Sequence, residues 1–288
     1  MPRRSLTFLF DPKWPDVGST VMRGLQVSEF ARAELGRRWR VRYLPLGSRV
    51  HGSAVFLTKN AAAVIGHERA AELVARGCRL YIDIVDSAPP AWASDVPCVI
   101  VTASLTSLTK VSRTHPHREV VFLTHQADPR VPAPPASRDT FRIGYFGEVF
   151  NARLTLAIES EVEIVPVATA TQTVAWFDRL PEFAMHYAIR RRIEQDDVKP
   201  FMKGFTAAAS HANILASRTD PEAVAWLGED YPYLIDGEHE EDILAMIERA
   251  RSDFGTTRWN DALTVMDGIR ERVAPLRVVH DLERIIAV

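Results

Sequence analysis

The chain has 288 residues, enough for two domains of roughly 130–150 residues that each bury a core. Hydrophobic residues make up 47% and charged residues 25%, the balance of an ordinary globular protein. The formal net charge of −2 lacks the basic surplus with which duplex-binding proteins replace phosphate counterions. Composition therefore argues against a nucleic-acid partner.

The start of the chain carries Arg3 and Arg4 before an apolar stretch. That stretch has only about five residues, too few for the core of a signal peptide. No run approaches the ~20 apolar residues of a membrane span, so we expect no span and a cytoplasmic location. Cys78 and Cys98 stand in or beside apolar runs, where we expect small buried hydrophobes rather than a disulfide or metal ligands.

Short apolar runs alternate with amphipathic stretches through the first half of the chain. The pattern predicts strands at residues 6–10, 41–44, 54–58, 79–85, 98–102 and 120–124, with helices at 20–38 and 68–75. Continuous apolar strands separated by helices are typical of a mainly parallel sheet that is covered on both faces.

A proline-rich segment follows, with four prolines in the seven residues 129–135. Proline fixes φ and lacks the amide donor, so this segment is predicted to be neither a helix nor an inner strand. We interpret it as a linker. The predicted domains are 1–128 and 141–274, joined by residues 129–140, with a separate terminal helix in 275–288.

The second half repeats the alternation. It predicts strands at residues 142–146, 162–167, 185–190, 214–216 and 231–235, with helices at 200–211, 221–227, 240–251, 258–273 and 276–286. Two doubly wound domains imply a crevice between them. Ligands of open α/β sheets bind beyond the carboxyl ends of the strands, so the crevice is the default site.

The segment from Lys199 to Ser217 is the most specific part of the sequence. Proline is favoured at the first helical position, so Pro200 predicts a helix start whose free amides attract an anion. Lys199 and Lys203 flank this start, where positive charge is locally unfavourable unless a diphosphate binds. Two solvated lysines on a surface helix are the alternative.

This segment resembles the donor-binding segment of bacterial glycosyltransferases with the GT-B fold: Lys-Pro-x-x-Lys, a small-residue helix, then a strand ending in Ala216-Ser217. The stretch 220–235 is similar to the helix and strand that come next in those enzymes. The broader retaining group has a glutamate where Lys203 falls and a second one that has no counterpart here. His211 and Asn213 replace small glycine and proline positions. The stereochemical outcome therefore stays open.

The resemblance implies a donor site in the second domain. Its expected residues are Gly144, Gly147, Glu148, Asn151, Arg190, Lys199, Pro200, Lys203 and Thr206. Gly147, at a strand end, would let a phosphate or sugar approach the backbone, although such glycines are common at strand ends. Arg190 opens a run of three arginines that could bind a phosphate or form a solvated surface.

The acceptor side is expected in the first domain. The loop with Gly18 and Ser19 would line the cleft as the family's corresponding loop does, and Arg23 would reach the same place. Ser19 or Thr20 could instead be the N-cap of the helix.

Asp83 and Asp86 are the best carboxylates for a general base that takes the acceptor proton. Asp86 could equally cap the following turn. His125 is the third candidate catalytic residue, because it resembles the histidine of a His-x-x-Asp near the interdomain boundary of related enzymes. A packing role at the hinge is the alternative. No set of side chains has metal-ligand spacing, so we expect no metal and no cofactor besides the nucleotide-sugar co-substrate.

Together these features predict two Rossmann-like, doubly wound α/β domains facing a cleft, with the last helix crossing back onto the first domain. The predicted activity is metal-independent transfer of a sugar, of hexosyltransferase type, from a nucleotide-sugar donor to an unidentified acceptor. A GT-B-like sugar-nucleotide epimerase and a catalytically degenerate partner subunit are the alternatives. The sequence leaves the donor, the acceptor and the oligomeric state open.

Overall fold

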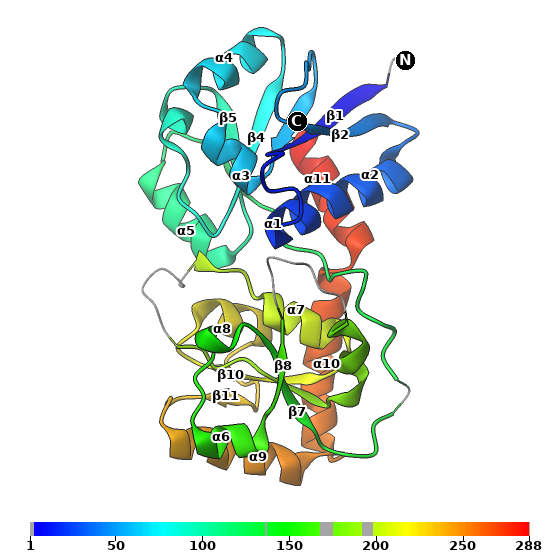
Figure 1. Cartoon of the computed structure of the whole chain (residues 1–288), viewed down its shortest axis with the longest axis vertical. Helices are drawn as coiled ribbons and strands as arrows, with labels where there is room; N and C mark the ends of the chain where they lie inside the picture. Colours follow the sequence, from blue (N-terminus) through cyan, green and yellow to red (C-terminus); the bar gives the residue numbers. More distant parts are fainter. Residues whose placement is uncertain (1–2, 136, 168–174, 192–197, 288) are drawn as a thin grey trace. The chain divides into compact units, whose positions relative to one another are not determined.

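The computed structural model describes residues 3–135, 137–167, 175–191 and 198–287 (Figure 1). Contacts divide the chain into two compact units. The first comprises Met1–Gln126, Val198–Pro200 and Pro275–Val288, and the second comprises Ala127–Asp197 and Phe201–Ala274.

The first unit is a parallel sheet with helices. Its strands are β1 (Arg4–Phe10), β2 (Trp39–Pro45), β3 (Ala54–Leu57), β4 (Arg79–Val85), β5 (Cys98–Thr102) and β6 (Val120–Phe122). Its helices are α1 (Gly18–Thr20), η1 (Val21–Gln26), α2 (Val27–Leu35), α3 (Lys59–Val64), α4 (His67–Ala75), η2 (Ala91–Ser94), α5 (Leu105–Thr114) and α11 (Pro275–Ile286). The described strands pair in the order β2-β1-β3-β4-β5-β6.

Each face of this sheet buries its own apolar cluster. Leu57, Ile82 and Ile100 pack on one face with residues of α3, α4 and α5. Phe8, Phe56 and further strand residues pack on the other face with α2 and α11, the blue and red helices that contact each other in Figure 1. Helix α11 enters this cluster through a single stripe of Val278, Val279, Leu282 and Ile286. Coverage on both faces explains why the strand sequences read as continuous apolar runs.

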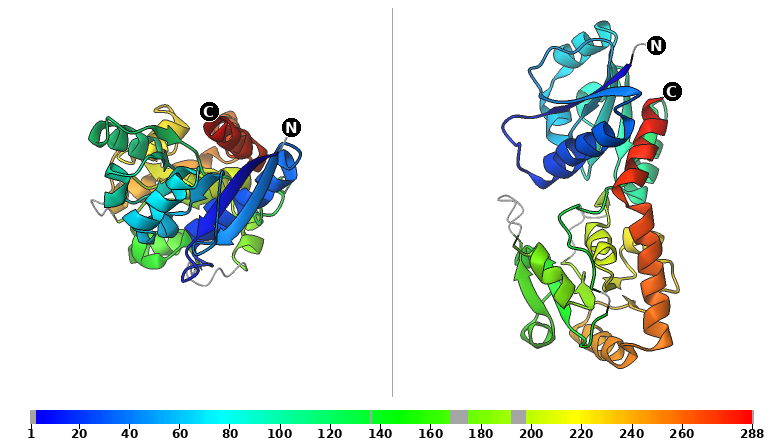
Figure 2. Two further views of the ribbon diagram at one scale, coloured as in Figure 1. Left: turned by 90° about the horizontal axis from the view of Figure 1, so that it is seen from above. Right: turned by 90° about the vertical axis from the view of Figure 1, so that its right-hand side faces the viewer.

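The second unit is also built on a parallel sheet. Its strands are β7 (Ile143–Gly147), β8 (Glu163–Pro166), β9 (Met185–Tyr187), β10 (Asn213–Ser217) and β11 (Leu234–Ile235). Its helices are η3 (Val149–Asn151), α6 (Leu156–Glu161), η4 (Phe177–Glu182), α7 (Met202–Ala209), α8 (Pro221–Leu227), α9 (Glu240–Asp253) and α10 (Thr257–Arg272). The described strands pair in the order β11-β10-β9-β7-β8. Figure 2 shows this sheet and its helices from two further sides.

Both sheets reverse their winding direction once. In the first unit β1 lies between β2 and β3, and in the second unit β7 lies between β8 and β9. The strand order thus changes direction between β1 and β3, and again between β7 and β9. Such switch points open a crevice at the carboxyl ends of the strands. The two parallel sheets with their helices confirm the predicted α/β class.

Several local predictions were wrong. Helix α7 begins at Met202 with Phe201 as its N-cap, not at Pro200. Neither Ser19 nor Thr20 is an N-cap, because the helical run begins at Gly18 after Val17. Strand β9 ends at Tyr187, and beyond it Arg190 makes only an isolated bridge to Ala152.

Helices α3, α5 and α6 were not predicted. The α5 segment is rich in Ser and Thr, which have low helix propensity. Ser104 nevertheless caps it by accepting a hydrogen bond of 3.1 Å from the Ser107 amide, and Thr155 caps α6 in the same way. These capping residues were the available signal. Among the described helices, none is long and apolar enough to cross a membrane.

Candidate functional site

Lys203 and Gly147 meet at the carboxyl end of β7, at the switch point of the second unit. The Lys203 ammonium donates to the Phe146 carbonyl at 2.5 Å and lies 4.0 Å from the centre of the Tyr145 ring. A Cβ added to Gly147 would lie 2.7 Å from Lys203 Nζ. A side chain at position 147 would displace the ammonium from the strand end, so the glycine leaves room for Lys203 there.

Burial makes the Lys203 ammonium unusually acidic. Loss of hydration and, to a smaller extent, the nearby Arg190 guanidinium lower the pKa of Lys203 from its usual 10.5 to about 7, against the opposing effect of Glu148. The sequence left open whether Lys203 binds a diphosphate or is a solvated surface lysine. In the structure Lys203 is a partly buried cation, and an added anion would stabilise its charged form.

The loop after β7 brings Arg190 to the same place. The backbone amide of Arg191 donates to the Asn151 carbonyl at 3.1 Å, which ties the loop to the segment after β9. The Asn151 side chain donates to the Glu148 carboxylate at 3.2 Å. Gly147, Glu148, Asn151, Arg190 and Lys203, predicted from separate segments, are thus brought together.

Other predicted donor residues have different surroundings. A Cβ on Gly144 would lie 2.6 Å from the Phe183 ring, so this glycine serves packing. The Thr206 hydroxyl donates to the Met202 carbonyl inside its own helix. Lys199 and Pro200 group with the first unit, so we do not include them in the site around Lys203. The third arginine of the run, Arg192, lies outside the described residues.

A second polar cluster at the same sheet edge was missed. Ser217, which ends β10, and Thr219 both donate to one oxygen of Glu238 at 3.0 and 2.9 Å. The other Glu238 oxygen lies 3.9 Å from Arg153. Glu238 follows β11, so the carboxyl-end rule that singled out Gly147 could have found it too.

The acceptor-side loop lies at the other switch point, between β1 and β3. Gly18 and Ser19 are partly exposed in α1. Nearby strand ends contribute buried polar atoms, and neither Asp11 Oδ2 nor Thr58 Oγ1 has a hydrogen-bond partner among the described residues. The first unit thus offers unsatisfied polar groups where a ligand of this sheet would bind.

Arg23 and Asp83 form a fully buried ion pair below that edge. Both Asp83 oxygens accept from Arg23, at 2.9 and 3.0 Å, and neither side chain reaches solvent. Arg23 also donates to the carbonyls of Leu123 and Thr124 at 2.8 and 2.7 Å. Arg23 does not reach the cleft-lining position expected of it, and Asp83 has no accessible oxygen with which to take a proton.

The side chains of Asp86 and His125 differ sharply in their exposure to solvent. Asp86 follows β4, is 26% exposed, and pairs with Lys59. His125 is buried, and neither ring nitrogen has a hydrogen-bond partner in the described parts of the chain. Burial and the Arg23 charge lower the pKa of His125 well below its usual value. Of the three predicted catalytic residues, Asp86 alone presents a carboxylate to solvent.

Several solved structures are similar to this chain in fold. A glycosyltransferase from Rickettsia africae ESF-5 is similar over 99% of this chain and 98% of its own, with a TM-score of 0.59 and 8% identity. The GtfA/B complex is similar over 92% of this chain, with a TM-score of 0.56 and 9% identity. The chain has the GT-B fold.

Another GT-B structure, the pneumococcal O-GlcNAc transferase GtfA in complex with UDP and GlcNAc, covers 91% of this chain with a TM-score of 0.55 and 8% identity. The chain spans 60% of the GtfA/B chain and 59% of this GtfA chain. No family model and no curated protein matches the sequence. In GT-B terms, the Lys203 cluster occupies the switch point of the second Rossmann-like unit.

Proposed function

We propose that the chain is a glycosyltransferase, of hexosyltransferase type, that transfers a sugar from a nucleotide-sugar donor to an acceptor without a metal. The observation that supports this best is the partly buried Lys203 ammonium at the β7–β9 switch point, against the Gly147 backbone and near Arg190. A partly buried cation beside backbone that carries no side chain suits an anion that needs close approach. UDP occupies the similar GtfA structure, which supports a donor of this class.

In the reaction, the acceptor oxygen forms a bond to the anomeric carbon as the bond from that carbon to the diphosphate oxygen breaks. The bonding electrons leave with the nucleoside diphosphate. Lys203 and Arg190 stabilise this developing negative charge, the task that a bound metal performs in other enzymes. Among the described residues, no three His, Cys, Asp or Glu side chains gather as metal ligands would.

The acceptor is proposed to bind at the switch point of the first unit, beside Gly18 and Ser19, with the two units facing a cleft. Asp86 would take the proton that the acceptor hydroxyl loses. Closure of the units would exclude water and thereby limit hydrolysis of the donor.

Replacement of Asp86 by asparagine should lower turnover while donor affinity stays unchanged. Loss of a general base costs about a hundredfold to ten-thousandfold in rate, but the donor is held by the other unit. Steady-state rates and calorimetric donor affinity measure the two effects. Asp95, an exposed carboxylate of the same unit, supplies the matched control Asp95→Asn. Equal rates in both variants would remove Asp86 from the mechanism.

Donor affinity should fall as the pH rises above about 7, the pKa of Lys203. Below that pH the free protein already carries the charge, and above it binding must take up a proton. The dissociation constant should therefore rise by up to about tenfold per pH unit until the pKa of the complex is reached. Calorimetry in buffers of different ionisation enthalpy detects the uptake directly.

The Lys203→Arg variant is the control for this pH dependence. Its guanidinium stays protonated at all these pH values. The donor affinity of the variant should therefore change by no more than about the experimental error between pH 6.5 and 8.5. A wild-type protein whose affinity is equally flat would contradict a role for the Lys203 charge.

The activity itself is tested by screening nucleotide sugars for binding and then supplying acceptors. A transferase releases nucleoside diphosphate in an acceptor-dependent manner. Conversion of the donor to an epimer without any acceptor would identify the epimerase alternative. Binding without either reaction would identify a partner subunit.

A further inference from the structure

The amino end of the first unit's sheet holds a strongly cationic cavity of about 590 Å³, far along the strands from the proposed acceptor loop. Its described lining includes five arginines and a single carboxylate: Arg3, Arg4, Arg37, Arg38, Arg284 and Glu283. A volume of this size lies in the range of small-molecule sites. It is larger than one inorganic ion requires.

Strand register brings these charges together. The parallel pairing of β1 and β2 aligns Arg4 with Trp39, and the Arg4 amide donates to the Arg38 carbonyl at 3.2 Å. Two arginine pairs that are 33 or more positions apart in the chain therefore stand side by side. The end of helix α11 adds Glu283 and Arg284.

Three of the arginines have structural partners. Arg38 contacts one Glu283 oxygen at 2.9 Å, while the Trp39 indole donates to the other oxygen. Arg4 lies over the Trp39 ring and donates to the Ala287 carbonyl at 3.4 Å. Arg284 pairs with Asp281. These contacts fix the wall of the cavity, and they occupy both oxygens of Glu283, the single carboxylate of the described lining.

Arg3 and Arg37 are different. Both are exposed, and neither has a hydrogen bond or ion pair to any described residue. Like charges gathered without counter-charge repel one another. Guanidinium groups bind phosphate oxygens in pairs of parallel hydrogen bonds, and several of them around one cavity suit a ligand with more than one phosphate.

We propose that this arginine cavity binds a ligand carrying two or more phosphate groups, at a site separate from the donor and acceptor sites. The phosphates lie between Arg3 and Arg37, and the partnered Arg4 and Arg38 hold the floor. The chemistry fits a soluble polyphosphate or the headgroups of an anionic membrane, which an experiment can separate. Because it uses none of the proposed transferase residues, the inference stands independently of that activity.

The test compares the full chain with the double variant Arg3→Ala/Arg37→Ala. Inorganic tripolyphosphate is titrated calorimetrically, and co-sedimentation is measured with vesicles of phosphatidylcholine mixed with phosphatidylglycerol. The double variant should lose about tenfold or more in tripolyphosphate affinity, since two charge-assisted contacts are removed. If the double variant also loses co-sedimentation with the vesicles, the phosphates that the cavity binds are those of membrane headgroups. If its co-sedimentation is unchanged, the ligand is a soluble polyphosphate.

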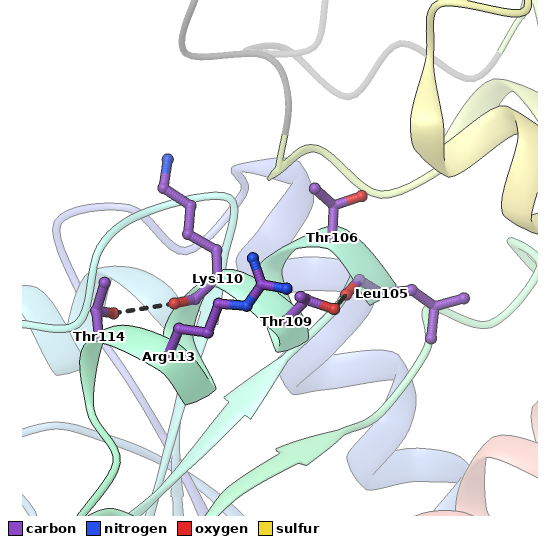
Figure 3. A pocket seen from close by; sticks show the side chains of 6 residues that line it. All are labelled: Leu105, Thr106, Thr109, Lys110, Arg113 and Thr114. Atoms are coloured by element: carbon purple, nitrogen blue, oxygen red, sulfur yellow. Dashed lines mark hydrogen bonds between the residues drawn. The ribbon is translucent and has the colours of Figure 1, made fainter.

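Helix α5 supplies the matched control. Figure 3 shows Lys110 and Arg113 beside a second cavity of about 480 Å³, with Thr109 and Thr114 bonded to the backbone of the same helix. Lys110→Ala/Arg113→Ala removes the same charge from a face whose described lining comes from one helix, and should leave both measurements unchanged. Lys203→Ala should also keep this binding, which separates the arginine cavity from the donor site.

Three results would each overturn the proposal: wild-type affinity in the Arg3→Ala/Arg37→Ala variant, equal losses in the α5 control, or no binding by the wild-type protein.

Discussion

Replacing Lys203 with alanine should weaken nucleotide-sugar binding by about tenfold to a hundredfold, since a charge-assisted hydrogen bond contributes roughly 1.5–3 kcal/mol. The melting temperature should stay the same or rise. Burial already lowers the pKa of Lys203 to about 7, so at neutral pH the fold gains little from its charged form. Calorimetry with the donor found by screening measures affinity, and a thermal melt measures stability.

Lys110, exposed on α5, is the control for loss of one positive charge. Lys110→Ala should bind donor as the wild type does. If the Lys203 variant also keeps full affinity, or loses it only in proportion to its loss of fold, the diphosphate site lies elsewhere. Weaker binding with an undiminished melting temperature is the outcome expected of a ligand-binding cation.

Replacing Asp83 with alanine should destabilise the protein by about 3–5 kcal/mol, the cost of leaving one member of a buried ion pair without its partner. Arg23 would keep only the carbonyls of Leu123 and Thr124 as acceptors. Urea denaturation of the full chain, followed by circular dichroism, should show an earlier transition for the first unit.

The double variant Arg23→Met/Asp83→Leu should recover much of that loss, because an apolar pair of similar volume removes both charges together. Asp95→Asn should leave the unfolding transition in place. If Asp83→Ala instead unfolds like the wild type but has lost turnover, Asp83 acts on the substrate and not in the core.

Local pattern was informative wherever one segment carried the signal. The apolar runs predicted strands in both units because parallel strands covered on both faces bury every side chain. Gly147 was identified because it is a glycine at the end of a predicted strand. Lys203 was identified because it is a positive charge near a predicted helix start. Pattern failed at α5, where Ser and Thr lower the helix propensity and packing of Val111 decides the conformation.

By itself, then, the sequence determined the α/β class, the parallel strands and which short segments carry charge near strand ends. Periodicity reports whether an element is buried, and it does so within a few neighbouring residues. The tertiary structure alone decided that Arg23 neutralises Asp83, sixty positions away, and that burial makes the Lys203 ammonium acidic. It also decided, through the register of β1 and β2, that two arginine pairs share one cavity. Strand order, register and depth of burial arise from contacts between distant segments, and no local pattern contains them.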